Sequence, residues 1–266
     1  MMIRYLTHMF TVKNAKYSYL TGIRTVLNKY VHRSYHDELK IDQFMKGAHN
    51  LKPPVSKYVA IWDPDRLLNH IMLIQPVSLK NTSYKLACLF MILAGTRINT
   101  ISHLKITNMF LTDQEVTFTF SDCLKHSRRG FKTAPITYRA FPHNSQLCPV
   151  IALRQYMEYR LTISNDPHLF VILVKPHRAA SADTLARWVK TCMGESGIDI
   201  GKFSAHSCRS SSTSKASFIG GNLKDIMRAA GWSIESTFRR FYEKDIIDSV
   251  EENNIGLNIL KNMSNI

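Results

Sequence analysis

The stretch SAHSCRSSSTSKA, residues 204–216, decides how we interpret the rest of the chain, because it joins a histidine and an arginine to a row of small hydroxyl side chains. Ser204 is a favourable N-cap residue and the glycines at 220–221 stop a helix, so we expect one helix that begins near Ser204. His206 and Arg209 lie three residues apart near its start, so they share a face and can reach one phosphate. Alone, the pair is weak evidence, since a solvated helix end in a basic protein often carries both residue types.

The charge of the chain favours a polyanionic partner. Its 266 residues contain 35 Lys and Arg against 20 Asp and Glu, a formal net charge of +15. An excess of this size favours nucleic acid or an anionic membrane surface. No apolar run approaches the roughly 20 residues that span a bilayer, and the apolar stretch at 86–95 is predicted to be a buried helix. The N-terminus lacks the continuous apolar region of a secretory signal, so we expect an intracellular protein with no membrane partner.

The cysteines predict neither a disulfide framework nor a metal site. The five cysteines are scattered, with no CxxC pair. Such a distribution is typical of reduced thiols inside a cell. We therefore predict no bound metal and no cofactor.

Hydrophobic periodicity predicts a mainly α fold with a small antiparallel β-hairpin. Alternating apolar residues at 115–120 and a second extended stretch at 131–138 flank a long basic turn, as two paired strands would. Gly95 ends a predicted helix in a left-handed turn, which places Arg97 at the start of the next helix.

Paired prolines at 53–54 forbid helix continuation and mark a linker. We predict a short helical domain over 1–55, a main domain over 56–248 and a tail over 249–266. The first domain is too short to bury much core alone, so we interpret it as an appendage or as the remnant of a larger helical domain.

Four stretches in one order resemble the catalytic domain of the tyrosine recombinase family, of phage integrase type: AGTR (94–97), LKHSRRG (124–130), SAHSCRSSSTSKA (204–216) and AAGWSIESTFRRFY (229–242). The HSxR…SxSKA and GWS…STFxxFY forms are most similar to recombinases of eukaryotic mobile elements, of the DIRS-like and Crypton kinds. The resemblance covers about residues 60–246. It implies that the first domain is the end of a truncated, SAM-like core-binding domain.

The resemblance also implies roles for individual residues. It implies that Tyr242 is the nucleophile and that Arg97 and Arg209 bind the scissile phosphate. Lys125 would be the general acid, and His206 and Trp232 would be the remaining phosphate-binding groups of the pocket. A phenol with a pKa of about 10 is mostly protonated at neutral pH, so its attack on a phosphodiester needs a base or nearby cations. His206 can act as that base or as a hydrogen-bond donor.

The resemblance implies double-stranded DNA as the partner, a homo-oligomer up to a synaptic tetramer on that DNA, and a nuclear location. Basic residues beyond the catalytic set are predicted to contact DNA phosphates; they are Arg128, Arg129, Lys132, Lys215, Arg239 and Arg240. In the tail, Ile255, Ile259 and Leu260 form an apolar stripe that can dock on a neighbouring subunit or pack on its own chain.

Three positions leave alternatives open. Thr100 stands where many relatives carry an acid that orients the first arginine. Trp232 and Tyr242 are one residue further apart than in bacterial relatives, whose spacing would put Phe241 in the nucleophile's place. The basic turn offers several candidates for the acid, among them Lys125 and His126.

We predict a site-specific recombinase that cleaves and rejoins DNA through a 3′-phosphotyrosyl intermediate. Two alternatives remain: an inactive DNA-binding derivative of a mobile-element recombinase, and an enzyme like type IB topoisomerase. Tyr242 can also be interpreted as a purely structural residue, because Tyr242 and Phe238 can form an aromatic stripe that only packs the core.

Overall fold

The computed structural model describes residues 2–32, 34–120, 134–232 and 235–247. The chain divides into two compact units between Lys57 and Tyr58. Among the helices of the described ranges, none is both long and apolar enough to cross a membrane.

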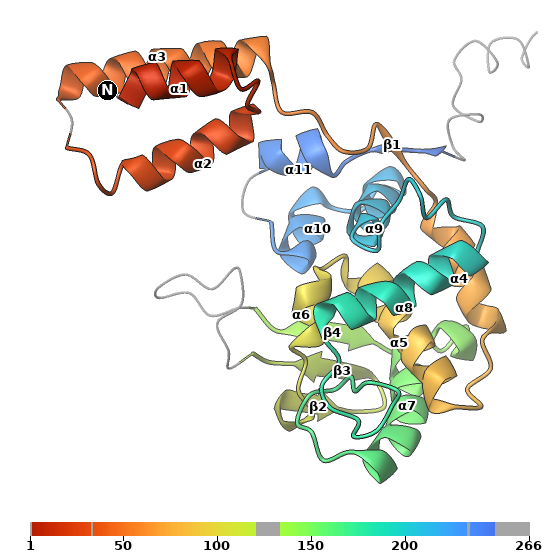
Figure 1. Cartoon of the computed structure of the whole chain (residues 1–266). Coiled ribbons are helices and arrows are strands. Elements are labelled where there is room, and N and C mark those ends of the chain that lie inside the picture. Colours follow the sequence, from red (N-terminus) through yellow and green to blue (C-terminus); the bar gives the residue numbers. More distant parts are fainter. Residues whose placement is uncertain (1, 33, 121–133, 233–234, 248–266) are drawn as a thin grey trace, which may run out of the picture. The chain divides into compact units, whose positions relative to one another are not determined.

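Unit 1 is a small bundle of helices α1 (Met2–Thr11), α2 (Tyr17–Leu27) and α3 (Tyr35–Leu51), drawn in red to orange in Figure 1. Each helix is amphipathic and turns its apolar face inward. The three helices bury a core of their own, formed by Met2, Leu6, Phe10, Leu20, Ile41, Met45 and Ala48. Despite its length, this unit therefore has a core that does not depend on residues from unit 2.

Unit 2 is mainly helical and carries the predicted small sheet. Its helices are α4 (Pro64–Leu73), α5 (Leu79–Ala94), α6 (Ile98–Ser102), α7 (Pro149–Ile163), α8 (Ala182–Glu195), α9 (Ser207–Phe218), α10 (Leu223–Ala230) and α11 (Glu235–Phe241), with short 3₁₀ turns at Ile106–Asn108 and Ser145–Leu147. Its strands are β1 (Ala60–Ile61), β2 (Met109–Leu111), β3 (Glu115–Phe118), β4 (Ile136–Arg139) and β5 (Asp245–Ile246).

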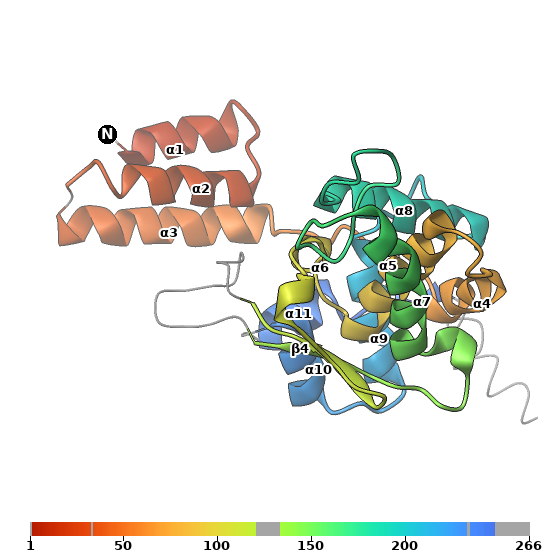
Figure 2. The ribbon, with the colours of Figure 1, turned by 90° about the horizontal axis from the view of Figure 1, so that it is seen from below.

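Helix α5 is the centre of unit 2, as Figures 1 and 2 both show. It packs against α4, α7, α8 and α9, and its residues from Lys85 to Ile92 are all buried. A helix buried on every side is apolar around its whole circumference, which explains the run LACLFMI. The predicted buried helix is thus confirmed, and Gly95 ends it in the left-handed conformation, with φ of 54°.

The predicted hairpin is part of a three-stranded antiparallel sheet in the order β2-β3-β4. Val116 of β3 pairs with Tyr138 of β4, and both side chains are buried against α5 and its neighbours. The sequence prediction omitted β2, because a three-residue strand next to a 3₁₀ turn has too little alternation to be recognised. The predicted fold class, mainly α with a small antiparallel sheet, is confirmed.

A separate pair of short strands joins the two ends of unit 2. β1 and β5 run parallel, with Ala60 opposite Asp245 and Ile61 opposite Ile246. β5 follows α11 almost directly in sequence. The backbone just after Tyr242 is therefore tied to the first strand of the unit.

Candidate active site

The turn at Gly95 brings the first predicted arginine to the helix that carries the second. A Cβ at Gly95 would lie 3.1 Å from the Thr213 Cγ2 atom of α9, so this close approach suits glycine as much as the positive φ does. The Gly95 carbonyl accepts a hydrogen bond from Arg209 Nη1 at 3.2 Å. Two residues on, Arg97 is the N-cap residue of α6.

Helix α9 begins later than predicted, which corrects the assignment of Ser204 as its cap. The helix starts at Ser207, and His206 occupies the N-cap position. The Ser207 amide donates to the Ser204 carbonyl in a tighter turn, and the Ser204 hydroxyl lies 3.3 Å from that of Tyr58. His206 is exposed at the helix start, whereas Arg209 is fully buried.

The Arg209 guanidinium is a buried cation with unused donors. Nη1 binds the Gly95 carbonyl, but Nε and Nη2 have no hydrogen-bond partner among the described residues. Burial, together with the positive charge of nearby Arg97, lowers the pKa of Arg209 to about 9. Burial also lowers the pKa of Arg97. The free protein therefore holds two cations close together, an arrangement that an anion would stabilise.

Trp232 lies between these cations and the predicted nucleophile. Gly231 ends α10 in the left-handed conformation and directs the chain toward the site. The Trp232 ring centroid is 4.2 Å from Arg209 Cζ and 5.8 Å from Arg97 Cζ, within cation–π range. Its indole Nε1 is buried and has no partner in the described part of the chain. It is a third unused donor at the same place.

The ring of Tyr242 belongs to this group. Its centroid is 3.9 Å from that of Trp232 and 5.6 Å from Arg209 Cζ. Tyr242 follows the last residue of α11, and its amide donates to the Phe238 carbonyl. The structure thus places Tyr242 beside the arginines. The side chain of Phe241 lies outside what the structure describes.

Serines of α9 hold the backbone of Tyr242, a feature that the sequence analysis missed. The Tyr242 carbonyl accepts hydrogen bonds from Ser210 Oγ at 3.1 Å and Ser214 Oγ at 2.7 Å, and Ser214 Oγ in turn accepts from the Lys244 amide at 2.9 Å. Both serines are buried. Their i, i+4 spacing was the available signal, because it puts both hydroxyls on one face of the helix.

The remaining predicted residues have different surroundings. Lys215 forms ion pairs of 2.8 Å with Asp63 and Asp65. Arg239 forms ion pairs with Glu235 and Glu243 along α11, and Arg240 is exposed on the same helix. The predicted hairpin residues Lys125, His126, Arg128, Arg129 and Lys132 lie outside the described residues, as does the apolar stripe of the tail.

Thr100 is buried on α6, one turn after Arg97. Its amide donates to the Arg97 carbonyl at 2.8 Å. A threonine carries no negative charge, so Thr100 does not reduce the electrostatic repulsion between Arg97 and Arg209.

A family comparison covers the part of the chain that carries these residues. The model of the phage integrase family matches residues 65–246, more than half of the chain and nearly all of unit 2. The chain belongs to the phage integrase family. No curated protein sequence matches the chain.

Solved structures share the integrase fold at low sequence identity. The XerA recombinase is 17% identical with a TM-score of 0.53, over 94% of this chain and 80% of that protein. The XerH site-specific recombinase, in a pre-cleavage complex with its difH substrate, is 17% identical with a TM-score of 0.55, over 90% and 70%. The integrase of transposon Tn1549, with transposon right-end DNA, is 14% identical with a TM-score of 0.51, over 94% and 89%.

Proposed function

We propose that this integrase-family protein is a site-specific DNA recombinase that cleaves and rejoins DNA through a 3′-phosphotyrosyl intermediate. The observation that carries the proposal is the set of buried donors around Tyr242 that have no partner among the described residues: Nε and Nη2 of Arg209 and Nε1 of Trp232. Buried polar groups are normally satisfied. Donors left open beside a phenol and two guanidiniums fit a phosphate oxygen supplied by another molecule.

The charges of the site fit phosphoryl transfer. Arginine is suited to a phosphodiester because its planar guanidinium offers bidentate donors and stays charged. Even with a pKa of about 9, Arg209 is protonated at neutral pH. As negative charge grows on the nonbridging oxygens, the donors of Arg97, Arg209 and Trp232 stabilise it without reorganising.

In the proposed reaction, the Tyr242 oxygen attacks phosphorus and the bond from phosphorus to the 5′ oxygen breaks. The phenol proton passes to a base, for which His206 at the start of α9 is our candidate, and the departing 5′ oxygen takes a proton from an acid, for which Lys125 is our candidate. A 5′ hydroxyl of another strand then reverses these steps. Each step exchanges one phosphodiester for another, so rejoining needs no external energy source.

The test is covalent trapping on DNA. A pool of nicked duplexes of randomised sequence releases the short fragment after attack and traps the enzyme, so the wild type should give a protein–DNA adduct that survives SDS. Tyr242→Phe should abolish the adduct. Tyr159→Phe is the matched control, because this phenol lies in the same unit but donates to the Pro76 carbonyl. An adduct that persists in Tyr242→Phe would refute the assignment of the nucleophile.

A second candidate function, DNA binding without strand exchange, is favoured by one observation: Thr100, one turn after Arg97, offers no carboxylate at the position where many relatives carry an acid. Binding that weakens with salt, and no adduct with any duplex of the pool, would support it. Relaxation of supercoiled plasmid without sequence preference would instead support topoisomerase activity.

The oligomeric state and origin complete the proposal. The solved relatives include a lambda integrase dimer on a core site and a tetramer on a Holliday junction, and we propose that this chain also acts as a homo-oligomer on double-stranded DNA. The SxSKA and GWS forms support an origin in a eukaryotic mobile element, with a nuclear location as the corresponding prediction. Arg239 and Arg240 on α11 are our candidates for contacts with DNA phosphates.

A further inference from the structure

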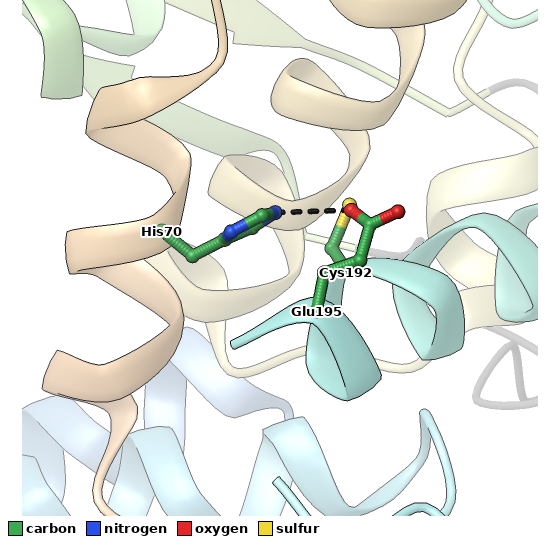
Figure 3. Close-up of side chains that lie close together, drawn as sticks. All are labelled: His70, Cys192 and Glu195. Atoms are coloured by element: carbon green, nitrogen blue, oxygen red, sulfur yellow. Dashed lines mark ion pairs between the residues drawn. The ribbon is translucent and has the colours of Figure 1, made fainter. Parts of the chain in front are cut away.

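We propose that His70, Cys192 and Glu195 bind one divalent cation of the zinc type, at a place separate from the active site. His70 lies on α4, and the other two lie three residues apart on α8, so that the side chains converge between the helices (Figure 3). One possible ligand atom from each residue lies within 4.8 Å of the other two. Neither helix carries a residue of the proposed catalytic set.

The geometry suits a shared cation better than an ion pair alone. His70 Nε2 and Glu195 Oε2 are 3.2 Å apart, close to the roughly 3.3 Å that separates two ligands held about 2.0 Å from a tetrahedral zinc. An ion pair would account for this distance. It would still leave Nε2, which is buried, without an aligned hydrogen bond among the described residues. A cation would accept the lone pair of that nitrogen.

The donor set and its charge select the kind of cation. Imidazole nitrogen, thiolate sulfur and carboxylate oxygen are the ligands that zinc takes in proteins, whereas calcium and magnesium prefer oxygen alone. A thiolate at Cys192 and the Glu195 carboxylate together neutralise a charge of 2+. Cys192 is fully buried and closes the inner side of the site.

The outer side leaves room for a fourth ligand. His70 and Glu195 line a cavity of about 330 Å³ together with Lys80, Asn81 and Tyr84. Water from this cavity can complete four-coordination, as in zinc sites with three protein ligands. Lys80 lines this cavity and its charge repels a cation, while its ammonium lies over the Tyr84 ring, 5.5 Å from the centroid.

The expected consequence is structural. Helices α4 and α8 pack on each other and both pack on α5, so a bound cation would join two helices of the same core. Binding to the folded state alone would stabilise unit 2 by mass action. The sequence prediction of no metal site rested on the missing CxxC pair, and it did not consider ligands that lie far apart in the chain.

The test uses the full chain, purified without a histidine tag and stripped of metal by a chelator. Titration with Co²⁺ should show one site per chain with thiolate-to-cobalt absorption, and Zn²⁺ should displace the Co²⁺. Cys192→Ala should abolish the absorption. Glu195→Gln changes an exposed residue at the end of α8, so it should keep the fold. It should weaken binding by more than about tenfold, the least that changes to outer-shell partners typically cause.

Cys148→Ala is the matched control. Cys148 is also a buried free thiol, but its sulfur accepts a hydrogen bond from the Phe141 amide and it is not one of the three converging residues. The control should keep both the absorption and the affinity. The proposal is overturned if the wild type shows no thiolate absorption with Co²⁺, or if Glu195→Gln binds Co²⁺ as tightly as the wild type does.

Discussion

Helix α9 carries two cations six residues apart, Lys215 and Arg209, and only Lys215 is paired with carboxylates of the described residues. Lys215 Nζ donates to both oxygens of Asp63 and to Asp65, at 2.8 to 3.1 Å. Arg209 is fully buried and keeps two donor nitrogens without a partner among the described residues. An unpaired buried charge is costly and a paired one much less so. The paired cation therefore serves the fold, whereas the cation without a partner among these residues fits the proposed binding of an anion from another molecule.

The two pKa shifts express the same contrast. Burial alone lowers the pKa of Lys215, but its hydrogen bonds to Asp63 and Asp65 outweigh that effect and raise the pKa overall. For Arg209 nothing outweighs burial and the nearby Arg97, so the pKa falls. Folding therefore favours the charged form of Lys215 and disfavours the charged form of Arg209.

The largest effect is expected when the unpaired cation, Arg209, is removed. Arg209→Met should lower the rate of adduct formation by about a hundred- to a thousandfold, because it removes a donor to the transition state. The same change should leave the free protein as stable as the wild type or more so, by about 1 kcal/mol, because it removes an unpaired buried charge. Adduct kinetics and urea unfolding measure the two effects. A large loss of stability would show that Arg209 serves the fold instead.

Lys215→Met should produce the opposite result. It leaves Asp63 and Asp65 without their cation, and we expect a loss of about 1 to 3 kcal/mol in the free energy of unfolding, because these groups are only partly exposed. Adduct formation by the folded fraction should change little. Arg239→Met is the control for an exposed ion pair and should leave the free energy of unfolding nearly unchanged. Equal losses of stability in the two variants would show that the ion pairs of Lys215 contribute no more than an exposed pair does.

Ser214→Ala tests whether α9 also positions the nucleophile. The change removes a 2.7 Å hydrogen bond to the Tyr242 carbonyl, worth about 1 kcal/mol of stability. A displaced phenol should slow adduct formation by about tenfold or more, since misplacement by 1 Å can cost roughly a hundredfold. DNA affinity should be unchanged. Ser212→Ala is the control, because its hydroxyl donates to the Ile92 carbonyl and not to Tyr242; equal rate losses in both variants would argue against positioning.

The smallest expected effect is a pH dependence of anion binding. The pKa of Arg209 in the free folded protein, about 9, lies below its ordinary value of 12.5. The cost of burying its charge is therefore present below pH 9 and is relieved as the pH rises above that value. Sulfate or phosphate should raise the melting temperature at neutral pH, and its affinity should fall by up to about tenfold one unit above the pKa. Arg209→Met should remove this dependence, and a wild-type affinity that does not change between pH 8 and 10 would contradict the assignment.

Several features of the site followed from local sequence alone. The left-handed turn at Gly95 and the placement of Arg97 at a helix start were predicted correctly, because glycine next to an apolar run has few other uses. The hairpin strands were recognisable by their alternation. The N-cap of α9 was misplaced by two residues, since Ser204 forms a contact with Tyr58 instead of capping the helix. That contact joins residues far apart in the chain, which local patterns do not reveal.

The serines of α9 show a second limit of sequence interpretation. Ser210 and Ser214 look like solvated helix positions in a polar stretch, yet both are buried and hold the backbone of Tyr242. The three converging residues His70, Cys192 and Glu195 are another case, because no spacing rule connects them. In both cases, packing between helices determines what the side chains do.

The sequence by itself determined which chemical groups this protein has and in which order they occur: two arginines, a histidine, a tryptophan and a tyrosine, with glycines at the turns between helices. Only the tertiary structure decided which cations are paired. Lys215 and Arg209 are both basic residues on one helix, and they differ because Asp63 and Asp65 approach one and a glycine turn approaches the other. Charge type is a property of the residue, whereas the cost of that charge depends on the neighbours that folding brings within a few ångströms.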